Sequence, residues 1–260
     1  MQATWASAAA YERYVGRWSR QVAVGFLRWL DVSPSQRWVD VGCGTGALTE
    51  AISERCDPAS VVGVDSSQSF VAWADEHIAD SRARFDVGDA TQLAPGTADV
   101  VVSGLVLTFL PQPIVAVSAM RAAAPAGLVA AYVWDYAGRM ELMRYFWDAA
   151  TDLDPRAADL DEGRRVGPTT PDRLEALWRE AGLINVSSTA VEVPTVFRDF
   201  DDYWTPFLGG QGPAPTYTVS LDEERRAAVR EALRARLPIE ADGTIHLIAR
   251  AWAVRGRSQP

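Results

Sequence analysis

The stretch "VDVGCGTG", Val39 to Gly46, decides the fold of this chain. Three glycines stand at alternate positions directly behind a short apolar run. Glycine adopts backbone conformations that other residues avoid, so such a loop is typical of a sharp turn from a strand into a helix. The first N–H groups of that helix favour a carboxylate or a phosphate. The loop alone is also compatible with a tight turn that binds nothing.

The spacing of the loop leaves two classes of cofactor open. Gly42, Gly44 and Gly46 form GxGxG, whereas Gly42, Gly44 and Ala47 fit the dinucleotide pattern G-x-G-x-x-[GA]. The loop spacing therefore does not distinguish a dinucleotide from an adenosyl cofactor that lacks a pyrophosphate. That distinction depends on the residues at the ends of the neighbouring strands.

Acidic residues end the next two predicted strands. Asp65 closes "VVGVD", where its carboxylate can accept hydrogen bonds from both hydroxyls of a ribose. Asp89 closes the third strand, where the exocyclic amine of adenine needs an acceptor. No arginine near the loop is placed to hold a pyrophosphate. These positions indicate an adenosine pocket without a phosphate site.

The composition excludes several other chemistries. All 25 basic residues are arginine, which rules out a phosphate-loop lysine, a Schiff-base lysine and the Tyr–Lys pair of hydride-transfer enzymes. The net charge of −9 argues against a large nucleic-acid interface. Two cysteines, Cys43 and Cys56, make neither a zinc pattern nor a disulfide framework, and no metal site is expected. With no signal peptide or membrane segment apparent, we expect a cytoplasmic protein without membrane insertion.

Short apolar runs alternate with helical stretches along the first half of the chain. We expect strands at 37–42, 60–65, 83–89, 98–104 and 127–135, and two further strands at 186–197 and 243–256. This rhythm predicts an α/β fold, a doubly wound, mostly parallel sheet with helices on both faces. We expect one domain over 1–260, with a helical lid (1–35), a cofactor-binding core (36–135) and cap elements for the substrate (136–184 and 198–240). The stretch 202–218 is predicted to be irregular.

Four stretches resemble the motifs of class I S-adenosylmethionine-dependent methyltransferases of the ubiquinone-biosynthesis-like, small-molecule type. They are "VDVGCGTG", "GVDSSQSFVAWA", "VGDATQL" and "ADVVVSGLVLTFLP". The resemblance covers roughly residues 10 to 135 with specific motifs and reaches the C-terminus more loosely. It implies a seven-stranded sheet of order 3-2-1-4-5-7-6 with the last strand antiparallel. The turn "AAPAGL" departs from the family pattern, because Ala126 replaces a glycine.

The resemblance also implies roles for individual residues. In this family the first acidic residue lies near the methionine end of S-adenosylmethionine, and the glycine loop approaches the cofactor with its backbone. The leader "YERYVGRWSR" resembles a segment that folds over the cofactor. The implied cofactor-binding residues are Tyr14, Trp18 and Arg20 in the lid, Asp40 at the methionine end, Gly42, Cys43 and Gly44 in the loop, Asp65 at the ribose, Ser66, Asp89 and Ala90 at the adenine, and Ser103 near the sulfonium.

The C-terminal half supplies an aromatic environment for an acceptor. When an anion attacks a sulfonium, charge disappears in the transition state, so a poorly solvating pocket that aligns the reactants favours the reaction. The expected substrate-pocket residues are Trp134, Tyr136, Trp147, Trp204 and Tyr217, with Phe146 and Phe207 beside them. No catalytic residue is identified. Asp135 is a candidate base or, equally, a helix N-cap, and His246 is a candidate base or a structural histidine.

The predicted function is methyl transfer from S-adenosylmethionine to a small-molecule acceptor through oxygen, nitrogen or carbon. Two alternatives remain: an NAD(P)-dependent oxidoreductase, and a non-catalytic protein that binds S-adenosylmethionine. A nucleic-acid substrate is not expected, because the fourth strand lacks the Asn/Asp-Pro-Pro-aromatic tetrad. The oligomeric state does not follow from these residues.

Overall fold

The computed structural model describes residues 12–164, 169–210 and 212–259. The chain divides into two compact units. Unit 1 consists of Met1–Trp18, Asp135–Val166 and Glu192–Arg250, and unit 2 consists of Ser19–Trp134, Gly167–Val191 and Ala251–Pro260.

A seven-stranded sheet has the order β3-β2-β1-β4-β5-β7-β6, which confirms the predicted order. Its strands are β1 (Arg37–Val41), β2 (Ser60–Asp65), β3 (Ala83–Val87), β4 (Val100–Gly104), β5 (Leu128–Trp134), β6 (Ile184–Phe197) and β7 (Ile245–Arg257). The pairs β1–β2, β1–β4, β2–β3 and β4–β5 are parallel, and β7 runs antiparallel to β5. Every residue of β5 is buried, as a central strand covered on both faces requires.

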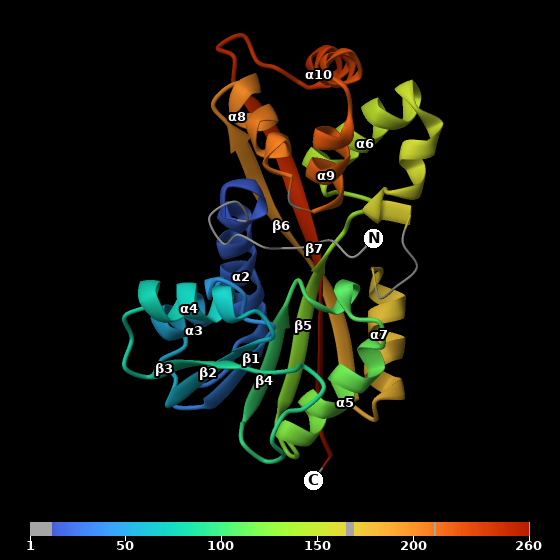
Figure 1. Cartoon of the computed structure of the whole chain (residues 1–260). Helices are drawn as coiled ribbons and strands as arrows, with labels where there is room; N and C mark the ends of the chain where they lie inside the picture. The colour runs from blue at the N-terminus through green and yellow to red at the C-terminus, as the bar shows by residue number, and fades with distance from the viewer. Residues whose placement is uncertain (1–11, 165–168, 211, 260) are drawn as a thin grey trace. The chain divides into compact units, whose positions relative to one another are not determined.

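Helices cover both faces of this sheet within unit 2 (Figure 1). They are α2 (Arg17–Leu30, whose first two residues belong to unit 1), α3 (Ala47–Arg55), α4 (Gln68–His77), η2 (Leu107–Phe109), α5 (Pro113–Ala123) and α7 (Pro171–Glu180). One core cluster joins α5 and α7 to β1, β4 and β5, and within it Trp178 Nε1 donates to the Val129 carbonyl at 3.1 Å. On the other face, Phe26 of α2 packs on Tyr132 with ring centroids 4.7 Å apart. This two-sided covering is the predicted doubly wound arrangement.

The leader is helical where the structure describes it. The π-helix η1 (Glu12–Gly16) continues into α2, which ends at Leu30, four residues before Pro34. The first eleven residues of the predicted lid lie outside the described part. Gly182 follows α7 with φ 80°, the left-handed conformation with which glycine commonly ends a helix. No helix in the described ranges is long and apolar enough to cross a membrane.

Unit 1 contains more helix than the sequence predicts. Its elements are η1, α6 (Glu141–Leu153), η3 (Pro155–Asp159), η4 (Glu162–Arg164), α8 (Phe200–Trp204), η5 (Thr205–Gly209), α9 (Pro213–Ser220) and α10 (Glu223–Arg236), with parts of β6 and β7. The prediction of irregular structure over 202–218 is therefore wrong. Pro206 lies in the first turn of η5 and Pro213 starts α9, positions where the missing N–H costs nothing. The Asp199 side chain caps α8 by accepting from Asp202 N.

Candidate functional site

The glycine loop after β1 needs glycine at each of its three positions. Gly42, Gly44 and Gly46 have φ values of 72°, 56° and 89°, a region that favours glycine. A Cβ at Gly42 would lie 2.3 Å from a Val106 methyl carbon, whereas a Cβ at Gly44 would meet nothing within 4 Å. Gly42 is therefore fixed by packing, and Gly44 faces open space where a ligand can approach the backbone.

Asp65, at the end of β2, holds the loop and the following turn together. Its Oδ2 accepts from Gly44 N at 2.9 Å and its Oδ1 accepts from Ser67 N at 2.8 Å. The residue is half-buried. Because a carboxylate oxygen can accept two hydrogen bonds, each oxygen retains capacity for a ligand hydroxyl. Asp65 therefore fits the predicted interaction with the two hydroxyls of a ribose.

Asp40, in β1 before the loop, is a buried acid with one unsatisfied oxygen. The residue is 1% exposed, and its Oδ2 accepts from Thr49 Oγ1 at 2.8 Å. Oδ1 is buried and has no hydrogen-bond partner among the described residues. Burial raises the pKa of Asp40 to about 7, against the opposing hydrogen bond from Thr49 and with a smaller contribution from the charge of Asp65. An unsatisfied buried carboxylate beside an open loop is suited to a cationic ligand group such as an amine.

The residues predicted at the adenine lie at the carboxyl ends of β2 and β3. Asp89 is exposed, and Thr91 donates to its Oδ1 from N at 2.8 Å and from Oγ1 at 2.7 Å. These bonds lower the pKa of Asp89 and keep it ionised. No described residue donates to its other oxygen, which is free to accept from a ligand amine. Ala90 is half-buried against the core cluster, and Ser66 is exposed.

Ser103 and Cys43 are held by the protein itself. Ser103 is 1% exposed, and its Oγ donates to the Val41 carbonyl at 2.8 Å, which ties β4 to β1. Cys43 is buried, and a Cβ at Gly63 would lie 3.0 Å from its Sγ. Burial raises the pKa of the Cys43 thiol, so it stays protonated and unreactive. The side chain of Cys43 therefore acts as a small packing group.

Two of the three predicted lid residues belong to unit 1. Tyr14 is 3% exposed, donates to Met143 Sδ at 2.9 Å, and packs edge-on against Phe207. Trp18 is also buried and packs edge-on against Phe197. Both are interior residues of unit 1, and their contact with a cofactor stays a prediction.

Arg20, the third predicted lid residue, belongs to unit 2. Its Nε lies 3.1 Å from Glu50 Oε2, and both side chains are more than one-third exposed. An exposed ion pair of this kind contributes about 0–1 kcal/mol. The role of Arg20 at the cofactor likewise remains a prediction.

Most of the predicted substrate-pocket aromatics come together inside unit 1. Phe146 stacks on Phe207 with centroids 4.6 Å apart, and Trp147 lies 5.8 Å from Tyr217. Trp204 packs against Phe207. The buried members in unit 1 are Tyr136, Phe146, Trp147, Trp204, Phe207 and Tyr217, whereas Trp134 ends β5 in unit 2.

A buried acid, Glu162, lies within this aromatic cluster and was missed from the sequence. It is 3% exposed, and its Oε2 accepts from Trp147 Nε1 at 2.5 Å. It also contributes to raising the pKa of Tyr14, although burial of the phenol is the larger cause. Glu162 stands in an acidic, arginine-rich stretch that is typical of a solvated loop, so no local signal indicates its burial.

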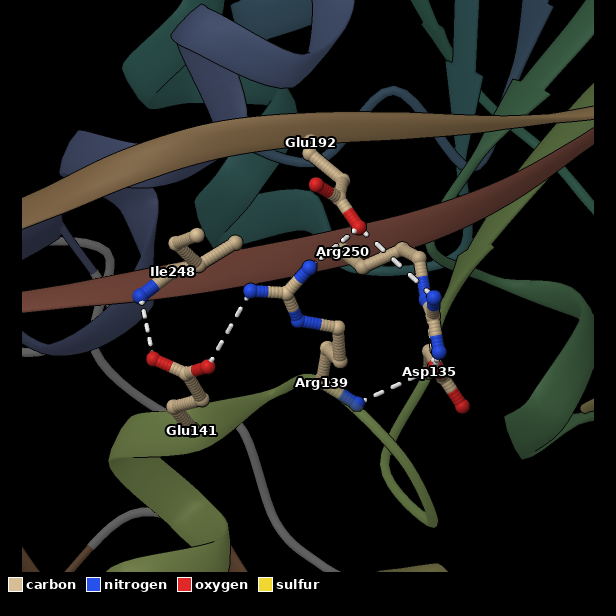
Figure 2. A network of polar contacts seen from close by, with 6 residues as sticks. All are labelled: Asp135, Arg139, Glu141, Glu192, Ile248 and Arg250. Carbon is tan, nitrogen blue, oxygen red and sulfur yellow. Dashed lines mark hydrogen bonds and ion pairs between the residues drawn. The ribbon is translucent and has the colours of Figure 1, made fainter.

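Asp135, the first candidate base, is engaged in a polar network within unit 1 (Figure 2). Its carboxylate accepts from Gly138 N and Arg139 N, each at 3.0 Å, and from Arg250 Nε at 2.7 Å. Arg139 in turn pairs with Glu192 at 3.0 Å. Asp135 therefore caps the turn before α6 and pairs with a cation, which leaves it poorly suited to accept a substrate proton.

The same network fastens α6 to β7. Glu141, the first residue of α6, accepts from Ile248 N at 2.7 Å, and its other oxygen lies 3.5 Å from Arg139 Nη2 (Figure 2). Its members lie up to 115 residues apart in the chain, so the sequence holds no local pattern that predicts it.

The histidines lie on the surface. His246 is exposed and its Nε2 is 3.1 Å from Thr244 Oγ1. His77 is exposed and stacks on Trp73 with centroids 4.0 Å apart. Across the described ranges, no three His, Cys, Asp or Glu side chains are grouped so as to hold a metal ion.

Comparison with known proteins gives a consistent set of similarities. Residues 39–131 match the family described as "Methyltransferase domain". A trans-aconitate 2-methyltransferase of Variovorax paradoxus is 33% identical over 125 residues, which cover 47% of this chain and 47% of that protein. A trans-aconitate 2-methyltransferase of Streptomyces avermitilis is 29% identical over 84% of each chain. The matched stretch thus spans about half of the first relative and most of the second.

Solved structures share the fold at low sequence identity. A crystal structure of a putative methyltransferase from Bacillus halodurans has a TM-score of 0.60 at 13% identity and covers 92% of this chain and 99% of its own. Phosphoethanolamine N-methyltransferase 2 of Haemonchus contortus, in complex with S-adenosyl-L-methionine, has a TM-score of 0.59 at 16% identity. It covers 100% of this chain and 58% of its own. At these identities the likeness concerns the fold.

Proposed function

We propose that this chain is a class I S-adenosylmethionine-dependent methyltransferase, which transfers the methyl group of S-adenosylmethionine to a small-molecule acceptor. The observation that carries the proposal is the buried, unsatisfied carboxylate oxygen of Asp40 beside the open glycine loop. An apolar turn without a ligand has no need for a buried acid of this kind, which is costly to leave unpaired.

The residues around the loop fit the three parts of the cofactor. Asp40 would hold the amino group of the methionine moiety, since an ammonium pairs with the oxygen that lacks a partner. Asp65 would accept from the ribose hydroxyls. Asp89, with Ser66 and Ala90, would contact the adenine. Gly44 leaves the space that the ligand needs.

S-adenosylmethionine supplies a methyl group that is already activated on a sulfonium. The chain then has to bind the reactants, orient them and exclude water. The role of the buried aromatic residues of unit 1 as an acceptor pocket stays a prediction, because their rings pack on one another. Since Asp135 is paired with Arg250 and His246 is exposed, we assign no general base and propose that alignment supplies most of the acceleration.

The names of the similar proteins suggest which acceptor to assay first. Two proteins named trans-aconitate 2-methyltransferase align with this chain, one of them over 84% of its length. We therefore propose trans-aconitate as the first acceptor to assay, ahead of amine and phenol acceptors.

Two measurements test the proposal together. Isothermal titration with S-adenosylhomocysteine is expected to show 1:1 binding that Asp65→Asn weakens, whereas Asp86→Asn, an exposed carboxylate on β3, leaves it unchanged. Methyl-labelled S-adenosylmethionine is expected to pass its label to trans-aconitate or to another metabolite. Binding of NADH without binding of S-adenosylhomocysteine would instead support the oxidoreductase alternative. Binding without any label transfer would support a non-catalytic role.

A further inference from the structure

A large cavity lies in unit 2 at the amino-terminal ends of the parallel strands. Its volume is 780 Å³, within the roughly 300–1,000 Å³ range of small-molecule sites. Its wall includes Arg37 at the start of β1, Val100 at the start of β4 and Leu128 at the start of β5. The glycine loop follows the opposite end of β1. Five residues of extended strand separate Arg37 from Gly42, about 16 Å, so the cavity is distinct from the proposed cofactor site.

Two arginines from the end of β7 line this cavity without a carboxylate partner. Arg255 and Arg257 are two positions apart on one strand, so they share a face and lie about 7 Å apart. Neither forms an ion pair with any described residue, although the chain holds 34 acidic residues against 25 basic ones. Arg37, by contrast, is neutralised by Asp99 at 2.8 Å.

The neighbours of Arg255 fix the position of its guanidinium but do not engage its Nη2 group. Its Nη1 donates to the carbonyls of Trp29 and Leu30 at 3.0 and 3.2 Å, and its Nε donates to Ser187 Oγ at 3.3 Å. The guanidinium lies 4.6 Å from the centre of the Trp29 ring. Nη2 donates to no described residue. A guanidinium held in this way loses little conformational freedom when it binds an anion.

The other residues that line the cavity contribute both polar and apolar groups. Asn185 also lines the cavity, with a left-handed backbone (φ 51°), a conformation that costs free energy and is frequent at binding sites. Leu30 and Leu128 supply apolar surface. Asp31 and Asp99 are the acidic residues of the wall; Asp99 pairs with Arg37, and neither forms an ion pair with Arg255 or Arg257.

We propose that this cavity is a second ligand site, which binds a small dianion through Arg255 and Arg257. The unpaired guanidinium of Arg257 binds one oxyanion oxygen, and Nη2 of Arg255 binds another. A short dicarboxylate and a phosphate monoester share this chemistry, because guanidinium groups pair with both kinds of oxyanion.

Isothermal titration of the full chain with succinate and with inorganic phosphate tests the proposal. We expect 1:1 binding of at least one probe, and a dissociation constant about tenfold higher in Arg257→Gln, since one charge-assisted hydrogen bond is lost. Arg28→Gln is the matched control: it removes an exposed arginine of the same unit that does not line the cavity. Binding of succinate alone indicates a dicarboxylate ligand, and binding of phosphate alone indicates a phosphate monoester.

Amide spectra of the ¹⁵N-labelled protein localise the probe. The signals of Gly127 and Gly256, which line the cavity, are expected to shift, and saturating S-adenosylhomocysteine is expected to leave the affinity unchanged. The proposal is overturned if neither probe binds at millimolar concentration, if Arg257→Gln binds as the wild type does, or if S-adenosylhomocysteine abolishes binding. Since none of these readouts uses methyl transfer, they are independent of the proposed activity.

Discussion

Replacing Asp40 by asparagine is expected to change how the stability of the cofactor-free protein depends on pH. The pKa of Asp40 is about 7 in the folded chain, against 3.8 for an unperturbed aspartate. A raised pKa means that the folded state holds its proton more tightly than the unfolded state does. The favourable contribution of the protonated group is therefore complete below about pH 4 and is lost as the pH rises through about 7.

The size of this effect follows from the two pKa values. They differ by about 3, which corresponds to about 4 kcal/mol, and about 2–3 kcal/mol of this is lost between pH 5 and pH 8. An asparagine side chain has no proton to lose, while its amide oxygen can still accept from Thr49. Asp40→Asn should therefore gain about 2–3 kcal/mol in free energy of unfolding relative to the wild type on going from pH 5 to pH 8.

Urea unfolding at pH 5 and pH 8, without cofactor, measures this difference. Asp86→Asn serves as the control, because the Asp86 side chain is 53% exposed and its removal should leave the pH dependence unchanged. If wild type and Asp40→Asn lose the same free energy between the two pH values, Asp40 is already ionised at pH 5 and the reasoning from its burial fails.

Three further substitutions test contacts within the individual units. Gly42→Ala forces a side chain onto a backbone with φ 72° and should cost about 1–3 kcal/mol, seen in urea unfolding. Arg250→Met leaves the buried Asp135 without its cation and should cost about 3–5 kcal/mol, seen as a lower Tm. Trp147→Phe removes the donor to buried Glu162 and should cost about 1–3 kcal/mol, measured by urea unfolding monitored by circular dichroism.

A control substitution for each variant shows whether the loss of stability comes from the assigned contact or from any change of that residue type. Gly96→Ala also places a side chain at a positive φ of 69°, but in open space, so it tests strain without the clash. Arg198→Met removes an 85% exposed arginine and should change Tm little. Trp73→Phe alters a half-buried tryptophan of α4 that stacks on the exposed His77. If a substitution and its control lower the free energy of unfolding or the Tm by the same amount, the contact assigned to that substitution is contradicted.

The positions of the strands and the turn after β1 could be predicted because their signals are local. Gly42, Gly44 and Gly46 indicate a turn by their spacing, and Asp65 and Asp89 each end an apolar run that periodicity identifies as a strand. The resemblance to a known family then supplied the order of the strands.

Other features could not be predicted, because they depend on residues far apart in the chain. The stretch from Asp199 to Ser220 forms short helices although it is rich in glycine and proline, since capping and aromatic packing outweigh propensity. The pairing of Asp135 with Arg250 spans 115 residues. The burial of Glu162 requires the fold of unit 1, and its own neighbours in sequence are polar.

The most direct test of the proposed activity is transfer of labelled methyl from S-adenosylmethionine by the purified chain. The assay mixture contains trans-aconitate and, in a parallel reaction, a metabolite extract. We predict that label enters a small-molecule product and that Asp65→Asn sharply reduces the rate. Absence of label from every small-molecule fraction, in a preparation that binds S-adenosylhomocysteine, would contradict the assignment of this chain as a working methyltransferase.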